Sequence, residues 1–472
     1  MQTADIIITN ARILTMDSAR PRATSLALGG GKIIALDDVS ALKAKHTRVI
    51  DAQNCTVMPG IIESHLHLFI GAIELESLNV SHIKGLDALT KAVREYAAKR
   101  PKDAVIVAKS AFHTMLRPEG IITRQDLDQV LPDQPLIVGC FDQHTVWANT
   151  KALQAAGILE GMALPPGNEI VMGADDKASG ELKEFAAYAP VMALTPTQGR
   201  EILGLSTGEG PVPPATAEQR AIDARYLKKG LDYCASLGIT TIHLMDGNFY
   251  QLELLEKIRM DGELICRAQV PWHQKNFMGL EKLEEAAEMN RKYRSSTLYS
   301  GRVKVFMDGV LESLTALTLE DYPGYPGNRG LPNFTAEEFD ELAIKADKLG
   351  LQITVHAIGD GAVRRTLDGF AAAQKANGKR DSRHRIEHLE LIDPADIPRF
   401  AELGVIASMQ PIVALGVPGV PLEPCLSRVA GKLGYTFGWQ RMRDAGARVI
   451  FSSDWPVSPL DPFLGIQAAM TR

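Results

Sequence analysis

Eight apolar segments, each followed by a stretch with helical periodicity, constrain the fold of this chain more than any other feature. Gly, Pro or Asp stands at the end of each segment or within two residues of it, and helix-like segments such as 335–349 and 362–377 lie between them. The strand-like segments are 61–69, 238–246, 264–272, 302–308, 351–358, 384–391, 405–411 and 448–455. Such an alternation predicts an α/β fold, a TIM-like (β/α)8 barrel.

Two further regions accompany this pattern. Residues 1–58 contain short runs rich in Ile, Leu and Thr, and glycines 29–31 stand where a tight turn needs positive φ, so we expect a small N-terminal β-sandwich-type domain. Residues 59–472 then form the barrel domain. The strand spacing is broken once, by about 70–218, and we expect this long insertion after the first barrel strand to be a cap over one barrel end.

Charge and cysteine usage exclude several classes of function. The chain has 51 Lys+Arg and 57 Asp+Glu, for a net charge of −6, and no basic stripe that would attract nucleic acid. Its five cysteines are scattered and form no disulfide framework, which favours a reducing compartment. No apolar stretch is long enough to span a membrane. We therefore expect a cytoplasmic protein with a small-molecule substrate and without a nucleic-acid or membrane partner, and a homo-oligomer stays open.

The first candidate for chemistry is the pair His65 and His67, which ends the first strand-like segment. Alternate side chains of a strand share a face, so both imidazoles can hold one metal ion. The pair is weak on its own, because 11 histidines in 472 residues give about 0.25 such pairs by chance.

Four other strand-like segments also end in a residue type that can bind metal: Lys304, His356, His388 and Asp454. An isolated histidine there is usually a packed core residue, and an isolated aspartate is often a helix cap. The C-terminal ends of barrel strands converge on one mouth, however, which is where enzymes of this architecture place their sites. Five strand ends with ligand-type residues therefore favour a metal centre.

The motifs around these residues resemble those of the amidohydrolase superfamily, and their sequences are similar to those of its YtcJ-like members (amidohydrolase family 3). They are Pro-Gly-Ile-Ile-Glu-Ser-His-Leu-His at 59–67, Val-His-Ala-Ile-Gly-Asp at 355–360, Arg-Ile-Glu-His-Leu-Glu at 385–390, Ser-Ser-Asp-Trp-Pro-Val-Ser-Pro at 452–459 and Asp-Gln-His-Thr-Val-Trp-Ala-Asn at 142–149. The resemblance covers nearly the whole chain. It implies a metal-dependent hydrolase with two divalent ions, zinc being expected first, while manganese or iron would suit the same ligands.

The resemblance also implies a role for each ligand. One ion would be held by His65, His67 and Asp454, and the other by His356 and His388, with Lys304 bridging both as an N-carboxylated lysine. The residues leave open an alternative in which Lys304 pairs with Asp308 and the site holds a single metal. Asp454 would be the catalytic base, because it can accept a proton from the metal-activated water and return it to the leaving nitrogen.

Candidates for contact with the substrate come from strand ends and from the insertion. They are His243, His273, Asp142, His144, Trp147 and Glu312. The two histidines near the second and third strand ends fit a pocket or a structural role equally well, whereas the three insertion residues rest on the resemblance. Glu312 departs from the family pattern and adds a carboxylate near the pocket.

We expect the chain to hydrolyse a non-peptide C–N bond, in an amide or an N-acyl or N-formyl compound. Two alternatives stay open: a catalytically weak regulatory or binding protein, and a deaminase on the same scaffold. The first is favoured by Gln143, where the family usually has glycine, and by the end of the chain at Arg472, which fits a shortened member or a fragment equally well. The Gly-x-Ser-x-Gly match at 204–208 is no nucleophile elbow, because prolines follow it where a helix would be needed.

Overall fold

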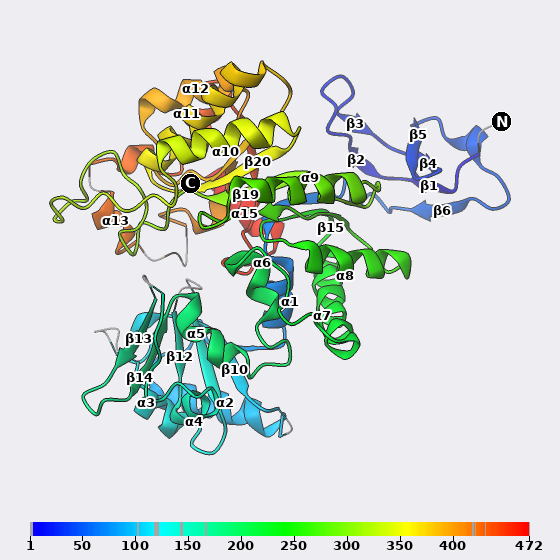
Figure 1. The fold of residues 1–472 in the computed structure, drawn as a ribbon. Coiled ribbons are helices and arrows are strands. Elements are labelled where there is room, and N and C mark those ends of the chain that lie inside the picture. Colours follow the sequence, from blue (N-terminus) through cyan, green and yellow to red (C-terminus); the bar gives the residue numbers. More distant parts are fainter. Residues whose placement is uncertain are drawn as a thin grey trace. The chain divides into compact units, whose positions relative to one another are not determined.

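The computed structural model describes residues 3–101, 103–117, 122–141, 145–165, 168–417, 420, 422–429 and 431–471. The chain divides into two compact units, Met1–Ile62 and Glu63–Arg472. Figure 1 shows the elements of both units. Within the described ranges, every helix is too short or too polar to cross a membrane.

The first unit is built of short strands arranged in two sheets. They are β1 (Ile6–Thr9), β2 (Arg12–Leu14), β3 (Arg22–Ala23), β4 (Leu26–Gly29), β5 (Lys32–Leu36), β6 (Arg48–Asp51) and β7 (Thr56–Val57). One sheet has the order β5-β4-β1-β6 and the other β3-β2-β7. Gly30 and Gly31 take positive φ between β4 and β5, which lets the chain reverse there. Ile13, Leu26 and their apolar neighbours from both sheets form one buried cluster.

The second unit contains the barrel strands. They are β8 (Ile61–Leu66), β15 (Ile239–Leu244), β16 (Arg267–Gln269), β17 (Trp272–His273), β18 (Leu298–Tyr299), β19 (Arg302–Phe306), β20 (Gln352–Ala357), β21 (Arg385–His388), β22 (Ile406–Met409) and β23 (Arg448–Phe451). The third and fourth barrel strands are each split into two pieces, β16 with β17 and β18 with β19. Their pieces pair in two sheets, β18-β16-β15-β8 and β17-β19-β20-β21-β22-β23.

The ring of strands closes between its first and last members. Leu66 bridges Trp455 in parallel, His67 N donates to Trp455 O at 2.8 Å, and Asp454 N donates to His65 O at 2.9 Å. The fold is therefore a TIM-barrel-like α/β fold, with every predicted strand segment contributing to the ring.

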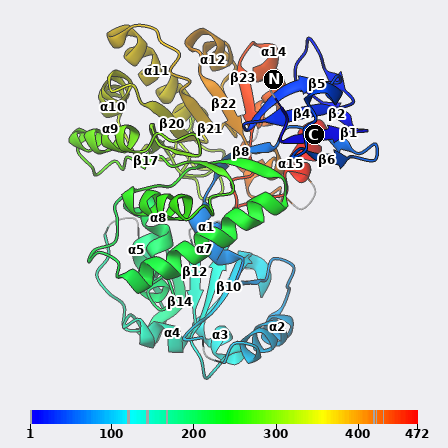
Figure 2. The same ribbon diagram turned by 90° about the vertical axis from the view of Figure 1, so that its right-hand side faces the viewer.

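Helices follow the barrel strands along the chain. They are α1 (Leu68–Glu74), α6 (Leu203–Ser206), α7 (Ala217–Ser236), α8 (Phe249–Met260), α9 (Leu283–Lys292), α10 (Ala336–Lys348), α11 (Asp360–Asn377), α12 (Ile397–Leu403), α13 (Cys425–Arg428), α14 (Trp439–Asp444) and α15 (Pro462–Thr471). Thr335 and Glu338 form a capping box that starts α10. In both views α10 and α11 run side by side next to β20 (Figures 1 and 2).

The insertion is a folded layer with its own sheet rather than a loose segment. Its strands and helices are β9 (Leu78–Asn79), α2 (Leu86–Ala98), β10 (Ile106–Ala111), α3 (Arg124–Val130), β11 (Leu136–Cys140), β12 (Thr145–Ala148), α4 (Thr150–Ala155), β13 (Glu169–Met172), β14 (Ala178–Lys183) and α5 (Phe185–Met192). In the sequence only the run 135–141 looks strand-like within the insertion, and it contains β11, whereas the sheet has the order β13-β14-β12-β11-β10-β9. β9 has two residues and β14 (ASGELK) has no β-branched or aromatic residue, so their sequences did not indicate strands.

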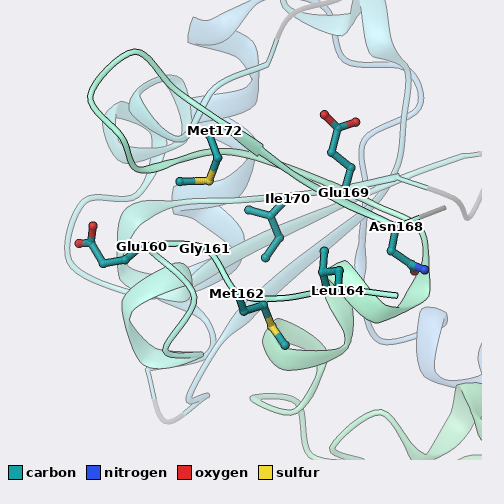
Figure 3. A pocket seen from close by; sticks show the side chains of 8 residues that line it. All are labelled: Glu160, Gly161, Met162, Leu164, Asn168, Glu169, Ile170 and Met172. Atoms are coloured by element: carbon teal, nitrogen blue, oxygen red, sulfur yellow. The ribbon is translucent and has the colours of Figure 1, made fainter. Parts of the chain in front are cut away.

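Figure 3 shows a pocket of the insertion, lined by residues from 160–164 and 168–172. None of the predicted metal ligands or substrate-contact residues lies in these two segments. The pocket therefore gives no reason to move the candidate site away from the strand ends.

Candidate metal centre

The first ligand candidate, His65, lies on β8, the second, His67, directly follows that strand, and the last one comes from the segment after β23. His65 Nε2 lies 3.1 Å and His67 Nε2 3.4 Å from Asp454 Oδ1. One ligand atom from each of the three buried side chains lies within 4.8 Å of the others, which is the spacing of a metal site. Asp454 Oδ1 is buried and accepts no hydrogen bond from any described residue.

Two buried carboxylates fix the orientation of these imidazoles. His65 Nδ1 lies 2.7 Å from Glu387 Oε2, and His67 Nδ1 lies 2.9 Å from Asp246 Oδ1. A carboxylate on Nδ1 holds its proton there and turns the Nε2 lone pair toward a metal. Both carboxylates were missed in the sequence, although Glu387 directly precedes His388 and Asp246 ends the second strand segment.

The electrostatic surroundings of His65, His67 and Asp454 favour a positive charge between these side chains. Burial lowers the pKa of His67, but Asp246 and Asp454 on either side outweigh it and raise that pKa to about 9. Burial raises the pKa of Asp454, but the nearby histidines outweigh it and hold it well below its usual range. Since metal ions compete with protons for such sites, the same surroundings that retain a proton suit a divalent cation.

His356 and His388 extend the group from β20 and β21. Their ring centroids are 4.4 Å apart, and His388 Nδ1 lies 4.0 Å from Asp454 Oδ2. Burial lowers the pKa of His388 to about 3 and that of His356 well below its usual value, which keeps both rings neutral. Neutral imidazole is the form that binds metal. His388 and Asp454 both take positive φ, at 75° and 61°, and such strain in non-glycine residues is typical of functional sites.

Lys304 on β19 lies fully buried, and its Nζ has no hydrogen-bond partner among the residues that the structure describes. Burial lowers its pKa to about 8. The predicted alternative, an ion pair with Asp308, does not form here. Asp308 instead accepts hydrogen bonds from the backbone N–H groups of Leu317, Ile358 and Gly359. Lys304 thus remains a buried cation without a counterion in contact.

Of the predicted substrate-contact residues, His273 lies beside this group. Its Nδ1 donates to Gly204 O at 3.0 Å, and its Nε2 is buried without a hydrogen-bond partner in the described chain. Burial lowers its pKa well below the usual value. The glycines of the 204–208 match serve this contact: a Cβ on Gly208 would lie 2.5 Å from His273 O. Ser206 Oγ donates to Ile202 O, so it is occupied in its own helix.

The other substrate-contact candidates have other neighbours or lie outside the described residues. His243 Nδ1 lies 3.3 Å from Arg385 and 3.4 Å from Arg302, which form part of the barrel interior. Trp147 is fully buried in the apolar core of the insertion. Glu312 is exposed in the segment after β19. The predicted contacts Asp142 and His144 lie outside the described residues.

Lys275, which the sequence did not single out, follows His273 by two residues. Its Nζ lies 5.2 Å from the ring centroid of Phe306 on β19. Burial and the neighbouring Lys304 lower its pKa to about 7, while Asp246 opposes this shift. The only sequence signal that could have pointed to Lys275 as a site residue is its position two residues after a histidine at a strand end.

Comparison with known proteins identifies the relatives of this site. A family model described as the amidohydrolase family matches residues 48–472. The chain belongs to the amidohydrolase family. The similarity to YtcJ-like amidohydrolases inferred from the motifs is confirmed, because the putative amidohydrolase YtcJ of Bacillus subtilis is 27% identical over 98% of this chain and 82% of its own length.

Other relatives match nearly the whole chain. Protein LONG AFTER FAR-RED 3 of Arabidopsis thaliana is 29% identical over 99% of this chain and 78% of its own length. N-substituted formamide deformylase of Arthrobacter pascens is 25% identical over 100% of this chain and 84% of its own length. An uncharacterized metal-dependent hydrolase from Pyrococcus horikoshii shares the fold, with a TM-score of 0.74 and 24% identity over 99% of this chain and 86% of the other. Family membership supports a metal-dependent hydrolase.

Proposed function

We propose that the protein hydrolyses a non-peptide C–N bond in an amide or an N-acyl or N-formyl compound. The observation that carries this proposal is the buried group of His65, His67 and Asp454, whose ligand atoms all lie within 4.8 Å of one another and whose Asp454 Oδ1 has no hydrogen-bond partner among the described residues. The N-substituted formamide deformylase, a relative along the whole chain, supports the same bond type.

The donor set fits divalent ions. Imidazole and carboxylate ligands suit zinc first, and manganese or iron next. In this proposal one ion is held by His65, His67 and Asp454 and a second by His356 and His388. Bound there, the ions would supply a hydroxide-forming water at neutral pH and a positive charge for the substrate carbonyl oxygen.

Lys304 supports the two-ion form of the proposal. A buried ammonium with no hydrogen bond is costly, and it would repel metal ions as a cation without a lone pair. Addition of carbon dioxide to the neutral amine, with release of one N–H proton to solvent, would turn Nζ into a carbamate, an anionic group with two oxygens. That group can bridge both ions and removes the unsatisfied charge.

Asp454 moves the proton in this proposal. Its carboxylate has two oxygens, and Oδ1 has no hydrogen-bond partner among the described residues, so the group has room to bind an ion and also to accept the proton of the attacking water and deliver it to the leaving nitrogen. Glu387 and Asp246 keep His65 and His67 in the tautomer whose Nε2 faces Asp454.

Metal analysis and a substrate panel test the proposal. The purified chain, supplied with zinc, manganese or iron, is assayed for release of the amine from N-formyl and N-acetyl amides. Asp454→Asn should abolish turnover while the circular dichroism spectrum is kept, and the exposed control Asp444→Asn should not change it. Well under one tightly held ion per chain, or turnover retained in Asp454→Asn, would contradict the proposal.

Four further features stay proposals beside this activity. The insertion covers the barrel mouth as a cap, and the two N-terminal sheets form a sandwich-type domain. The partner is a small molecule rather than nucleic acid or membrane, and the protein acts in the cytoplasm. The scattered cysteines and the net charge of −6 support the last two.

A further inference from the structure

Phe306, the last residue of β19, is surrounded by polar side chains at the carboxyl ends of the barrel strands. Its ring centroid lies 4.8 Å from that of His356 and 5.0 Å from that of His273. The Nζ atoms of Lys304 and Lys275 lie 5.0 Å and 5.2 Å from it. His356 and Lys304 belong to the proposed metal centre, whereas His273 and Lys275 have no part in it. The shared ring therefore places these two residues directly beside the centre.

His273 presents a buried hydrogen-bond acceptor in this place. A carbonyl oxygen can only accept, so the contact with Gly204 O puts the single proton of the neutral imidazole on Nδ1. Nε2 then carries a lone pair. The side chain is fully buried, and Nε2 meets no donor in the part of the chain that the structure describes. A buried acceptor without a donor is costly, and an N–H group of a ligand would satisfy it.

Lys275 presents an amine without an anionic partner in the described chain. Among the described residues no ion pair joins it to a carboxylate. Asp246 is the carboxylate that raises the pKa of Lys275. Both of its oxygens already have partners, because one lies 2.9 Å from His67 Nδ1 and the other accepts from Gln251 Nε2 at 2.9 Å. A ligand carboxylate would supply the counterion that the protein does not.

We propose that His273 and Lys275 form a subsite for a secondary amide that bears a carboxylate on its amine side. His273 Nε2 accepts the amide N–H, Lys275 Nζ pairs with the carboxylate, and the ring of Phe306 packs against the carbon skeleton. Two polar groups on adjacent substrate atoms match two residues that are two positions apart in the chain and lie 5.0 Å and 5.2 Å from the centroid of the same ring. This inference rests on the proposed hydrolysis of a C–N bond and narrows its substrate class.

The test compares substrates that differ only in the carboxylate. The panel holds N-formyl and N-acetyl amino acids of both configurations, each beside the amide of the amine that lacks the carboxylate, such as N-formylphenylalanine and N-formyl-2-phenylethylamine. Lys275→Met keeps the apolar stem and removes the charge. The matched control is Lys292→Met, an exposed lysine that also lies over a ring, 5.3 Å from that of Tyr293.

We expect the metal-loaded wild type to prefer the carboxylate member of a pair by about 10- to 100-fold in kcat/KM, the usual worth of a charge-assisted hydrogen bond. Lys275→Met should remove this preference, and Lys292→Met should retain it. Calorimetric titration of the same pairs into Asp454→Asn, with and without Lys275→Met, reports binding without turnover and should show the same preference.

The outcomes separate this inference from the proposed function. Turnover with equal or better use of the neutral members, or a preference that survives Lys275→Met, overturns the subsite and leaves C–N hydrolysis standing. If no member of the panel is hydrolysed, the proposed function is contradicted, and the titration alone decides the subsite: carboxylate binding that depends on Lys275 supports it, and equal binding of both members overturns it.

Discussion

Asp246→Asn tests whether a carboxylate behind His67 sets the metal affinity of the site. Asp246 is fully buried, and its two oxygens meet His67 Nδ1 and Gln251 Nε2. Asparagine keeps an acceptor for His67. If the Gln251 side-chain amide rotates by 180°, the new N–H₂ group can donate to Gln251 Oε1, which has no partner among the described residues. The substitution thus removes a charge and keeps the shape and the hydrogen bonds.

The size of the effect follows from this geometry. The 2.9 Å contact and the width of the imidazole place the Asp246 charge about 5 Å from His67 Nε2 and about 7 Å from an ion bound there, where a double charge is worth about 5 kcal/mol at an effective dielectric constant of about 20. Screening and relaxation reduce this upper bound, and loss of such a carboxylate typically weakens metal binding by about 10- to 100-fold. We expect a loss of about 1.4–2.7 kcal/mol in metal affinity.

Competition with a chromogenic chelator measures the affinity, and urea unfolding of the metal-free protein measures stability. Asp232→Asn, an exposed change on α7, is the control for the loss of a negative charge. Asp246→Asn should lower zinc affinity and change the free energy of unfolding of the metal-free protein by less than about 1 kcal/mol. Equal zinc affinities for Asp246→Asn and Asp232→Asn would refute the role given to this carboxylate.

Three further predictions concern separate sites. Lys304→Met should lower the number of bound ions per chain and remove the carbamate signal that ¹³C-labelled bicarbonate gives in wild-type NMR spectra; an unlabelled wild type would contradict the bridge. Gly208→Ala, at φ 71° and with its Cβ 2.5 Å from His273 O, should cost about 1–3 kcal/mol more stability than Gly262→Ala, whose φ is 76° but whose Cβ meets nothing within 4 Å. Burial raises the pKa of Glu201 to about 7, so its contribution to stability falls as pH rises from about 4.5 to 7, and Glu201→Gln should flatten that part of the unfolding profile by up to about 3 kcal/mol.

The residues that sequence reasoning brought to the site share one property, their place at the end of a strand. His65, His356 and His388 could be grouped because a barrel directs all carboxyl ends to one mouth, whatever the loops do. His243 shows the limit of this argument. It also lies near the end of a strand, but its side chain contacts Arg302 and Arg385 in the barrel interior. Whether such a side chain faces the mouth or the interior depends on the neighbouring strands, which the sequence of one strand does not show.

The insertion shows a second limit. Trp147 was assigned to the substrate from the resemblance, yet the structure buries it in an apolar core between elements of which the sequence indicated only β11. Short strands such as β9 and β13 carry too few residues to show a period of two, so their side chains cannot be assigned to a face in advance. Asp246 and Glu387 were missed for another reason, since a carboxylate behind a ligand is recognisable only when the ligand's ring orientation is known.

The contacts that close the barrel also assemble the candidate metal centre. Asp454 N donates to His65 O, and Glu63 accepts hydrogen bonds from the backbone N–H groups of His65 and Ser453. The same backbone pairing that joins the first and last strands therefore fixes the spacing between the two imidazoles and the carboxylate. Because the ligands lie almost 400 positions apart along the chain, the site forms only when the ring closes, so metal binding must favour the closed barrel over any form in which these strands have separated.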